Sequence, residues 1–128
     1  MSAMLITNNN AAASVAANGI LPLGAAIHGY GSSIRLNGNG INLLGKGYYK
    51  VTASITAAPS GTGVFTAQLY NNGTAIAGAV ASATPTAANA YVNLTIVWIV
   101  KRCCETTALT LVANGAASVT NTTVVVEQ

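Results

Sequence analysis

The side chains in this sequence that could carry out chemistry are few. Its 128 residues include two cysteines, Cys103 and Cys104, one histidine, His28, and two carboxylic side chains, Glu105 and Glu127. Adjacent cysteines can form only a strained ring with one another, and a zinc site would need further ligands from a second pair that the chain lacks. Reduced thiols are the simplest reading. Disulfides between subunits and a metal site stay open as alternatives, and we keep the cysteine pair as a candidate cross-link.

The spacing of these residues fits no known catalytic constellation. A serine triad would have to combine His28 with Glu105 or Glu127, and no nucleophile-elbow motif is present. The two glutamates could form a glycosidase pair, but solvated charges near strand ends are the simpler interpretation. The glycines form neither a GxGxxG nor a Walker pattern. We therefore expect no enzymatic activity and no cofactor or metal.

The composition excludes further classes of function. Charged residues make up 5% of the chain, against about 25% in ordinary soluble domains. The net charge is +3, but its five basic residues are spread along the sequence and can neutralise few phosphates, so we expect no nucleic-acid partner. The longest strongly apolar stretch, residues 96–100, is far shorter than the roughly 18 residues of a membrane span. A surface with so few charged residues favours self-association.

Short alternating runs separated by glycine-rich turns predict an all-β fold of about eight strands. The clearest run is residues 48–56, where Tyr49 and Val51 alternate with polar residues. Asn72-Gly73 is the strongest hairpin signal. We also expect a final hairpin between residues 107–113 and 118–126, joined at Asn114-Gly115. The pattern predicts an antiparallel sandwich or jelly roll.

The longest expected strand, residues 91–100, is apolar on both faces at its end. Leu94, Ile96 and Trp98 share the face that we assign to the core, whereas Val97 and Ile99 lie on the other face. Two apolar faces predict core on one side and a neighbouring subunit on the other. The candidate core or interface residues are Tyr48, Tyr49, Leu94, Ile96, Val97, Trp98 and Ile99.

Residues 1–24 break the pattern of strands and turns. Their alanine-rich part is too short and poorly capped for a helix, so we predict an extended N-terminal arm, or an outer strand near residues 14–17, that precedes a domain of residues 25–128. Leu5, Ile6 and Val15 are the candidate attachment residues, and we expect the fold not to need the arm. The first ten residues lack the features of a Sec signal, so we expect synthesis in a host cytoplasm.

Three motifs together resemble a known family. They are Gly47-Tyr48-Tyr49-x-Val51, the run from Leu69 to Ile76 through Asn72-Gly73, and Leu109-x-Leu111-x-x-Asn114-Gly115 before a valine-rich strand. Over residues 24–127 the chain resembles the C1q/TNF-like jelly rolls of bacterial and phage surface proteins. It looks most like small virion proteins of tailed phages that infect Firmicutes, and more distantly like the C-terminal domains of spore-surface collagen-like proteins.

The resemblance implies a compact homotrimer with a structural or adhesive function. The chain has no aspartate for calcium and no Gly-X-Y segment, which argues against a calcium-dependent or collagen-stalked member. Our first hypothesis is a capsid decoration protein that binds the major capsid protein, or another virion surface protein, on the outside of the head. The alternative is a fibre tip or spore-surface adhesin that recognises glycans, with Tyr30 and Tyr70 as its exposed aromatic residues.

Overall fold

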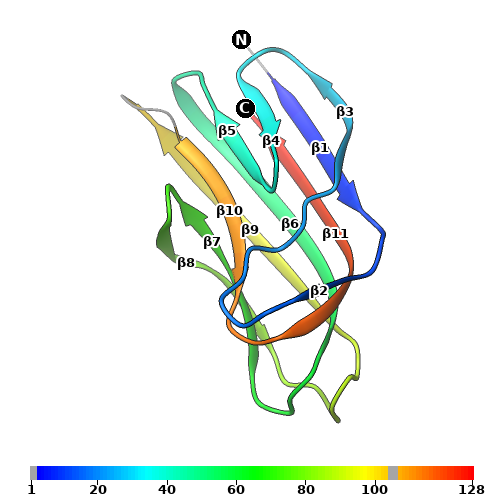
Figure 1. Ribbon diagram of the computed structural model, residues 1–128. Helices are drawn as coiled ribbons and strands as arrows, with labels where there is room; N and C mark the ends of the chain where they lie inside the picture. Colours follow the sequence, from blue (N-terminus) through cyan, green and yellow to red (C-terminus); the bar gives the residue numbers. More distant parts are fainter. Residues whose placement is uncertain (1–2, 104–106) are drawn as a thin grey trace.

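The computed structural model describes residues 3–103 and 107–128, which form eleven β-strands and no helix. Two antiparallel sheets pack face to face as a sandwich (Figure 1). The strands are β1 (Met4–Asn9), β2 (Ala13–Val15), β3 (Ala25–Tyr30), β4 (Ile34–Asn37), β5 (Gly40–Leu43), β6 (Gly47–Pro59), β7 (Phe65–Asn71), β8 (Thr74–Ala83), β9 (Val92–Arg102), β10 (Thr107–Ala113) and β11 (Ala117–Glu127). The described part of the chain contains no helix long and apolar enough to span a membrane.

In both sheets, strands that are far apart in the sequence are neighbours. The six-stranded sheet has the order β3-β1-β11-β6-β9, with β2 also pairing with β11, and the five-stranded sheet has the order β4-β5-β10-β7-β8. The all-β jelly roll that the sequence predicts is therefore confirmed. The strands are more numerous than the predicted eight, because the N-terminal part contributes strands of its own.

The core lies between the sheets and follows the period-two alternation of the strands. Tyr49, Leu94 and Ile96 are buried there. The Tyr49 hydroxyl donates a hydrogen bond of 2.6 Å to the carbonyl oxygen of Gly45, so this large buried ring leaves no polar atom unsatisfied. The neighbouring Tyr48 points to the opposite side of β6 and is exposed.

Of the two predicted Asn-Gly hairpins, one is correct. Asn72 and Gly73 both have positive φ, 51° and 83°, and join the paired strands β7 and β8. Asn114-Gly115 instead links β10 to β11, which belong to different sheets. The Asn114 side chain holds this turn against the start of β7, because its Oδ1 accepts a hydrogen bond from the Thr66 N–H and its Nδ2 donates one to the Val64 carbonyl. The turn is thus fixed to β7 and crosses between the sheets.

The prediction of an N-terminal arm outside the fold is wrong for the described residues. Strand β1 lies inside the six-stranded sheet, paired with β3 on one side and β11 on the other. Leu5 is buried in the core, and Leu21 and Leu23 are completely or almost completely buried. Val15, on β2, packs partly buried against the same core. Residues 3–24 therefore belong to the sandwich and are not separate from a domain of residues 25–128.

Two threonine hydroxyls on the core side of β1 and β11 lack partners within the described residues. Thr7 and Thr122 are completely buried, and neither Oγ1 makes a hydrogen bond. Because a buried hydroxyl without a partner costs free energy, we expect Thr122→Val to raise the free energy of unfolding by about 1 kcal/mol, measured by urea denaturation. The control is Thr123→Val, which removes a hydroxyl that accepts a 2.8 Å hydrogen bond from Asn8 Nδ2. Stabilisation by the control, or destabilisation by Thr122→Val, would contradict this expectation.

Candidate functional site

The outer face of the six-stranded sheet presents two neighbouring rows of side chains. Because residues that are paired across strands share a face, the register defines each row. One row contains His28, Ile6, Val125, Thr52 and Val97, and the next contains Tyr30, Met4, Glu127, Lys50 and Ile99. We call these ten residues the outer rows. Most are apolar or aromatic, which is unusual for a sheet face turned away from the core.

The outer rows include two well-exposed aliphatic residues on β9, one of the two edge strands of this sheet. Val97 is 55% exposed and Ile99 is 62% exposed, and with Trp98 they line an open hollow of about 370 Å³ (pale strand β9, Figure 1). A long apolar edge strand with an open side invites pairing or packing by another chain. Both residues face outward, on the side that the sequence analysis assigned to a neighbouring subunit.

Next to the outer rows, at the start of β6, lie an aromatic residue and lysines. Tyr48 pairs with Lys101 in register and is 63% exposed, and the Lys101 ammonium lies 5.7 Å from the centre of the Tyr48 ring. Such a cation–π contact contributes about 0.5–1 kcal/mol at an exposed site. Lys50 lies between Ile99 and Glu127 in the neighbouring row, so the apolar area ends at a charged margin.

The other end of the same face is polar, and its side chains bond to one another. Asn8 Nδ2 donates hydrogen bonds to Asn121 Oδ1 at 3.1 Å and to Thr123 Oγ1 at 2.8 Å. The Thr56 hydroxyl donates to Asn93 Oδ1 at 2.8 Å. These bonds satisfy the polar groups within the chain, so the apolar area is confined to the outer rows and their margin.

Trp98 closes the sandwich at the edge where β8 and β9 meet. It is half-buried against the core, less than the full burial that the sequence analysis expected. Its ring packs on Gly78 of β8, where a Cβ atom would come within 2.7 Å of the ring carbon Cη2. Gly78 also has a φ of +92°. Glycine suits this position because it has no Cβ to meet the ring and because it adopts a positive φ without strain. The sequence alone did not indicate this contact.

We expect Gly78→Ala to destabilise the protein by about 1–3 kcal/mol, because the new Cβ meets the Trp98 ring and the backbone conformation disfavours a side chain. Equilibrium unfolding followed by Trp98 fluorescence measures this. Gly61→Ala is the matched control, since nothing lies within 4 Å of the added Cβ. A Gly78→Ala variant as stable as the control would show that the ring moves aside freely.

The residues that could do chemistry are not brought together. His28 lies exposed on β3, whereas Glu127 lies on β11, with β1 between them. Cys103 is disulfide-bonded, in contrast to the reduced thiol that the sequence favoured, while Cys104 and Glu105 fall outside the described residues. Among the described residues, no group of three or more histidine, cysteine or carboxylic side chains could hold a metal ion.

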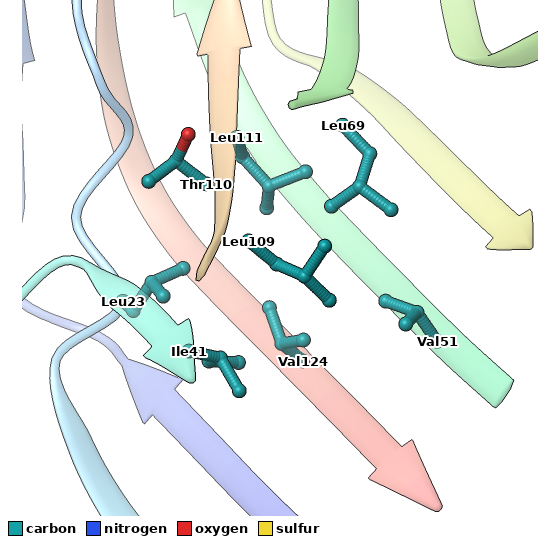
Figure 2. A pocket seen from close by; sticks show the side chains of 8 residues that line it. All are labelled: Leu23, Ile41, Val51, Leu69, Leu109, Thr110, Leu111 and Val124. Atoms are coloured by element: carbon teal, nitrogen blue, oxygen red, sulfur yellow. The ribbon is translucent and has the colours of Figure 1, made fainter. Parts of the chain in front are cut away.

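Between the sheets, among the residues that the structure describes, lies a small apolar cavity. It has a volume of about 10 Å³ and is lined mainly by side chains of Leu, Ile and Val (Figure 2). Leu109 and Leu111 point into it, whereas the Thr110 hydroxyl lies on the other side of β10 (Figure 2). An apolar space of this size is at the limit for one water molecule.

Comparison with known proteins gives a fold but no family. No protein-family model matches the sequence, and no curated protein matches it. Murine APRIL matches the structure with a TM-score of 0.77 at 10% identity, over 100% of both chains. The globular domain of zebrafish complement 1qA protein has a TM-score of 0.69 at 4% identity, covering 98% of this chain and 94% of that one.

A viral protein shares the same architecture. The PRD1 vertex protein P5 matches with a TM-score of 0.57 at 18% identity, over 98% of this chain and 94% of its own. Together these neighbours show that the chain is a C1q/TNF-like jelly roll. The narrower resemblance to phages of Firmicutes receives no support from them.

Proposed function

We propose that this protein is a structural virion protein, a homotrimeric decoration protein on the outside of a phage capsid. The observation that carries the proposal is the exposed apolar area of the outer rows, with Val97 and Ile99 uncovered on an edge strand. Apolar area of this kind on a surface with so few charges is stable in water when a second chain covers it. Three copies, as the C1q/TNF-like resemblance implies, would cover one another's outer rows.

The likeness to the PRD1 vertex protein P5 supports the proposed location on the surface of a virion. In this proposal the chain is made in the host cytoplasm and reaches the virion by assembly, and its partners are its own copies and the major capsid protein or another virion surface protein. The proposal includes no catalytic role.

The part of strand β3 that does not belong to the outer rows is the surface that we assign to contact with the shell. All six of its residues are exposed, and Ile27, 53% exposed, has no partner in the ladder with β1 because it lies at the shift in register between Ile6 and Thr7. Ile27 does not belong to the outer rows, and in this proposal it stays uncovered when those rows are buried between copies. Threefold repetition raises the effective concentration of each such contact. A protein that binds only the assembled shell stabilises it by mass action.

The proposal is tested with heads of the phage that encodes the chain, prepared without this protein. We expect the added protein to sediment with the heads and to raise the temperature at which they release DNA. Ile27→Lys should weaken this binding while leaving the mass of the free oligomer unchanged. Heads that neither bind nor gain stability would contradict the decoration function, whatever the oligomeric state.

A further inference from the structure

A shallow hollow lies on the outer face of the five-stranded sheet, on the opposite side of the sandwich from the outer rows. Its volume is about 60 Å³. Val112 of β10 forms the floor, and Gln68 and Tyr70 of β7 stand beside it. The far wall is the segment that contains Asn18 and Ile20, which runs along β10 through a 2.8 Å hydrogen bond from the Asn18 N–H to the Ala113 carbonyl and a bridge between Ile20 and Val112.

Two amide side chains at the rim are held in place. Gln68 Nε2 donates a 2.9 Å hydrogen bond to the carbonyl of Ile76, which leaves its Oε1 pointing away from that bond. Asn114 is fixed by its bonds to Thr66 and Val64, at 2.8 and 3.1 Å. Anchored groups lose less conformational entropy when a ligand binds. The rim is therefore organised before any ligand arrives.

The chemistry of the hollow favours one class of ligand. All the described residues that line it are uncharged, so an anionic or cationic ligand gains no ion pair there. The backbone of β7 is already paired with β10 and β8, so a peptide strand could not add to the sheet at this place. What remains for a ligand are amide and hydroxyl groups around one aromatic ring and one aliphatic floor.

We infer that this hollow is a binding site for a neutral saccharide. Sugar hydroxyls both donate and accept hydrogen bonds, so they can bond to the Tyr70 hydroxyl and to the remaining donor and acceptor positions of the Gln68 and Asn114 amides. The C–H face of a sugar ring would lie on the Tyr70 ring and Val112. The site does not depend on the decoration function or on the trimer, because its residues lie in a single chain and face away from the outer rows.

The test titrates the full chain, labelled with nitrogen-15, with maltotriose and separately with triacetylchitotriose. We expect at least one to shift the side-chain amide signals of Gln68 and Asn114, with a dissociation constant in the millimolar range. Tyr70→Ala should weaken this binding about tenfold. Tyr91→Ala is the matched control, since Tyr91 is 67% exposed and lies before β9, outside the hollow.

Several results would overturn the inference. One is that neither trisaccharide shifts these amide signals at roughly 20 mM, a concentration that detects even millimolar affinity. Others are that the shifted signals belong to residues outside the hollow, or that only a sulfated or phosphorylated saccharide binds. Equal binding by wild type and Tyr70→Ala would also contradict the site. If Tyr70→Ala does not fold, Gln68→Leu at the same rim is judged by the same criteria.

Discussion

A chain that lacks residues 1–9 is expected not to fold. Strand β1 pairs with β11 over six residue pairs, from Met4–Glu127 to Asn9–Thr122, and β3 pairs only with β1 in the sheet. Deletion would remove both ladders and the buried Leu5 side chain, for a loss of about 5 kcal/mol or more. Because whole domains are stable by only about 5–15 kcal/mol, we expect the β-type circular dichroism and the cooperative unfolding transition to disappear.

Two neighbouring residues of β1 separate its role in folding from its role in association. Leu5 faces the core, whereas Ile6 belongs to the outer rows. We expect Leu5→Asn to lower the free energy of unfolding by about 2–5 kcal/mol, and Ile6→Asn to fold but associate less tightly. A truncated chain that still unfolds cooperatively would show that β1 is an accessory strand.

The double substitution Val97→Asp and Ile99→Asp should convert the proposed trimer to a folded monomer. Both side chains are exposed in one chain, so the substitution costs the fold little. In the assembly each new carboxylate would be buried without a partner, which costs several kcal/mol per charge. Light scattering should give the mass of one chain, 12.8 kDa, while circular dichroism stays unchanged.

The matched control for this pair is Thr95→Asp, on the same face of the same strand. Thr95 is exposed and pairs with Ser54, in the polar row next to the outer rows. We expect Thr95→Asp to retain the mass of the wild type. An unchanged mass in the double variant would instead place the interface between copies on a different surface.

Strands that show a clear alternation of apolar and polar residues over a few neighbouring positions could be predicted from the sequence. The alternation in β6 and β9 placed Tyr49 and Leu94 on the core side and Ile99 outside, and the positive φ values of Asn72-Gly73 suit the hairpin that was expected there. A period of two requires no knowledge of the partner strand, so sequence reasoning can read it.

The missed features depend on contacts between distant residues. Residues 1–24 were interpreted as an arm because they break the pattern of strands and turns, and β11, the strand that pairs with β1, is more than 100 residues away in the chain. Without that pairing, Met4 and Val125 could not be placed beside Val97 in one surface. Likewise, the turns at Asn72 and Asn114 both precede a glycine, and they differ in that β7 and β8 pair in one sheet whereas β10 and β11 belong to different sheets.

The central claim is that copies of this chain associate in threes through the outer rows. Size-exclusion chromatography with light scattering, on the wild-type protein at micromolar concentration, tests it most directly. The account predicts a single species with three times the 12.8 kDa mass of one chain. A stable monomer at that concentration would contradict it, and would leave the exposed Val97 and Ile99 without the partner that we propose.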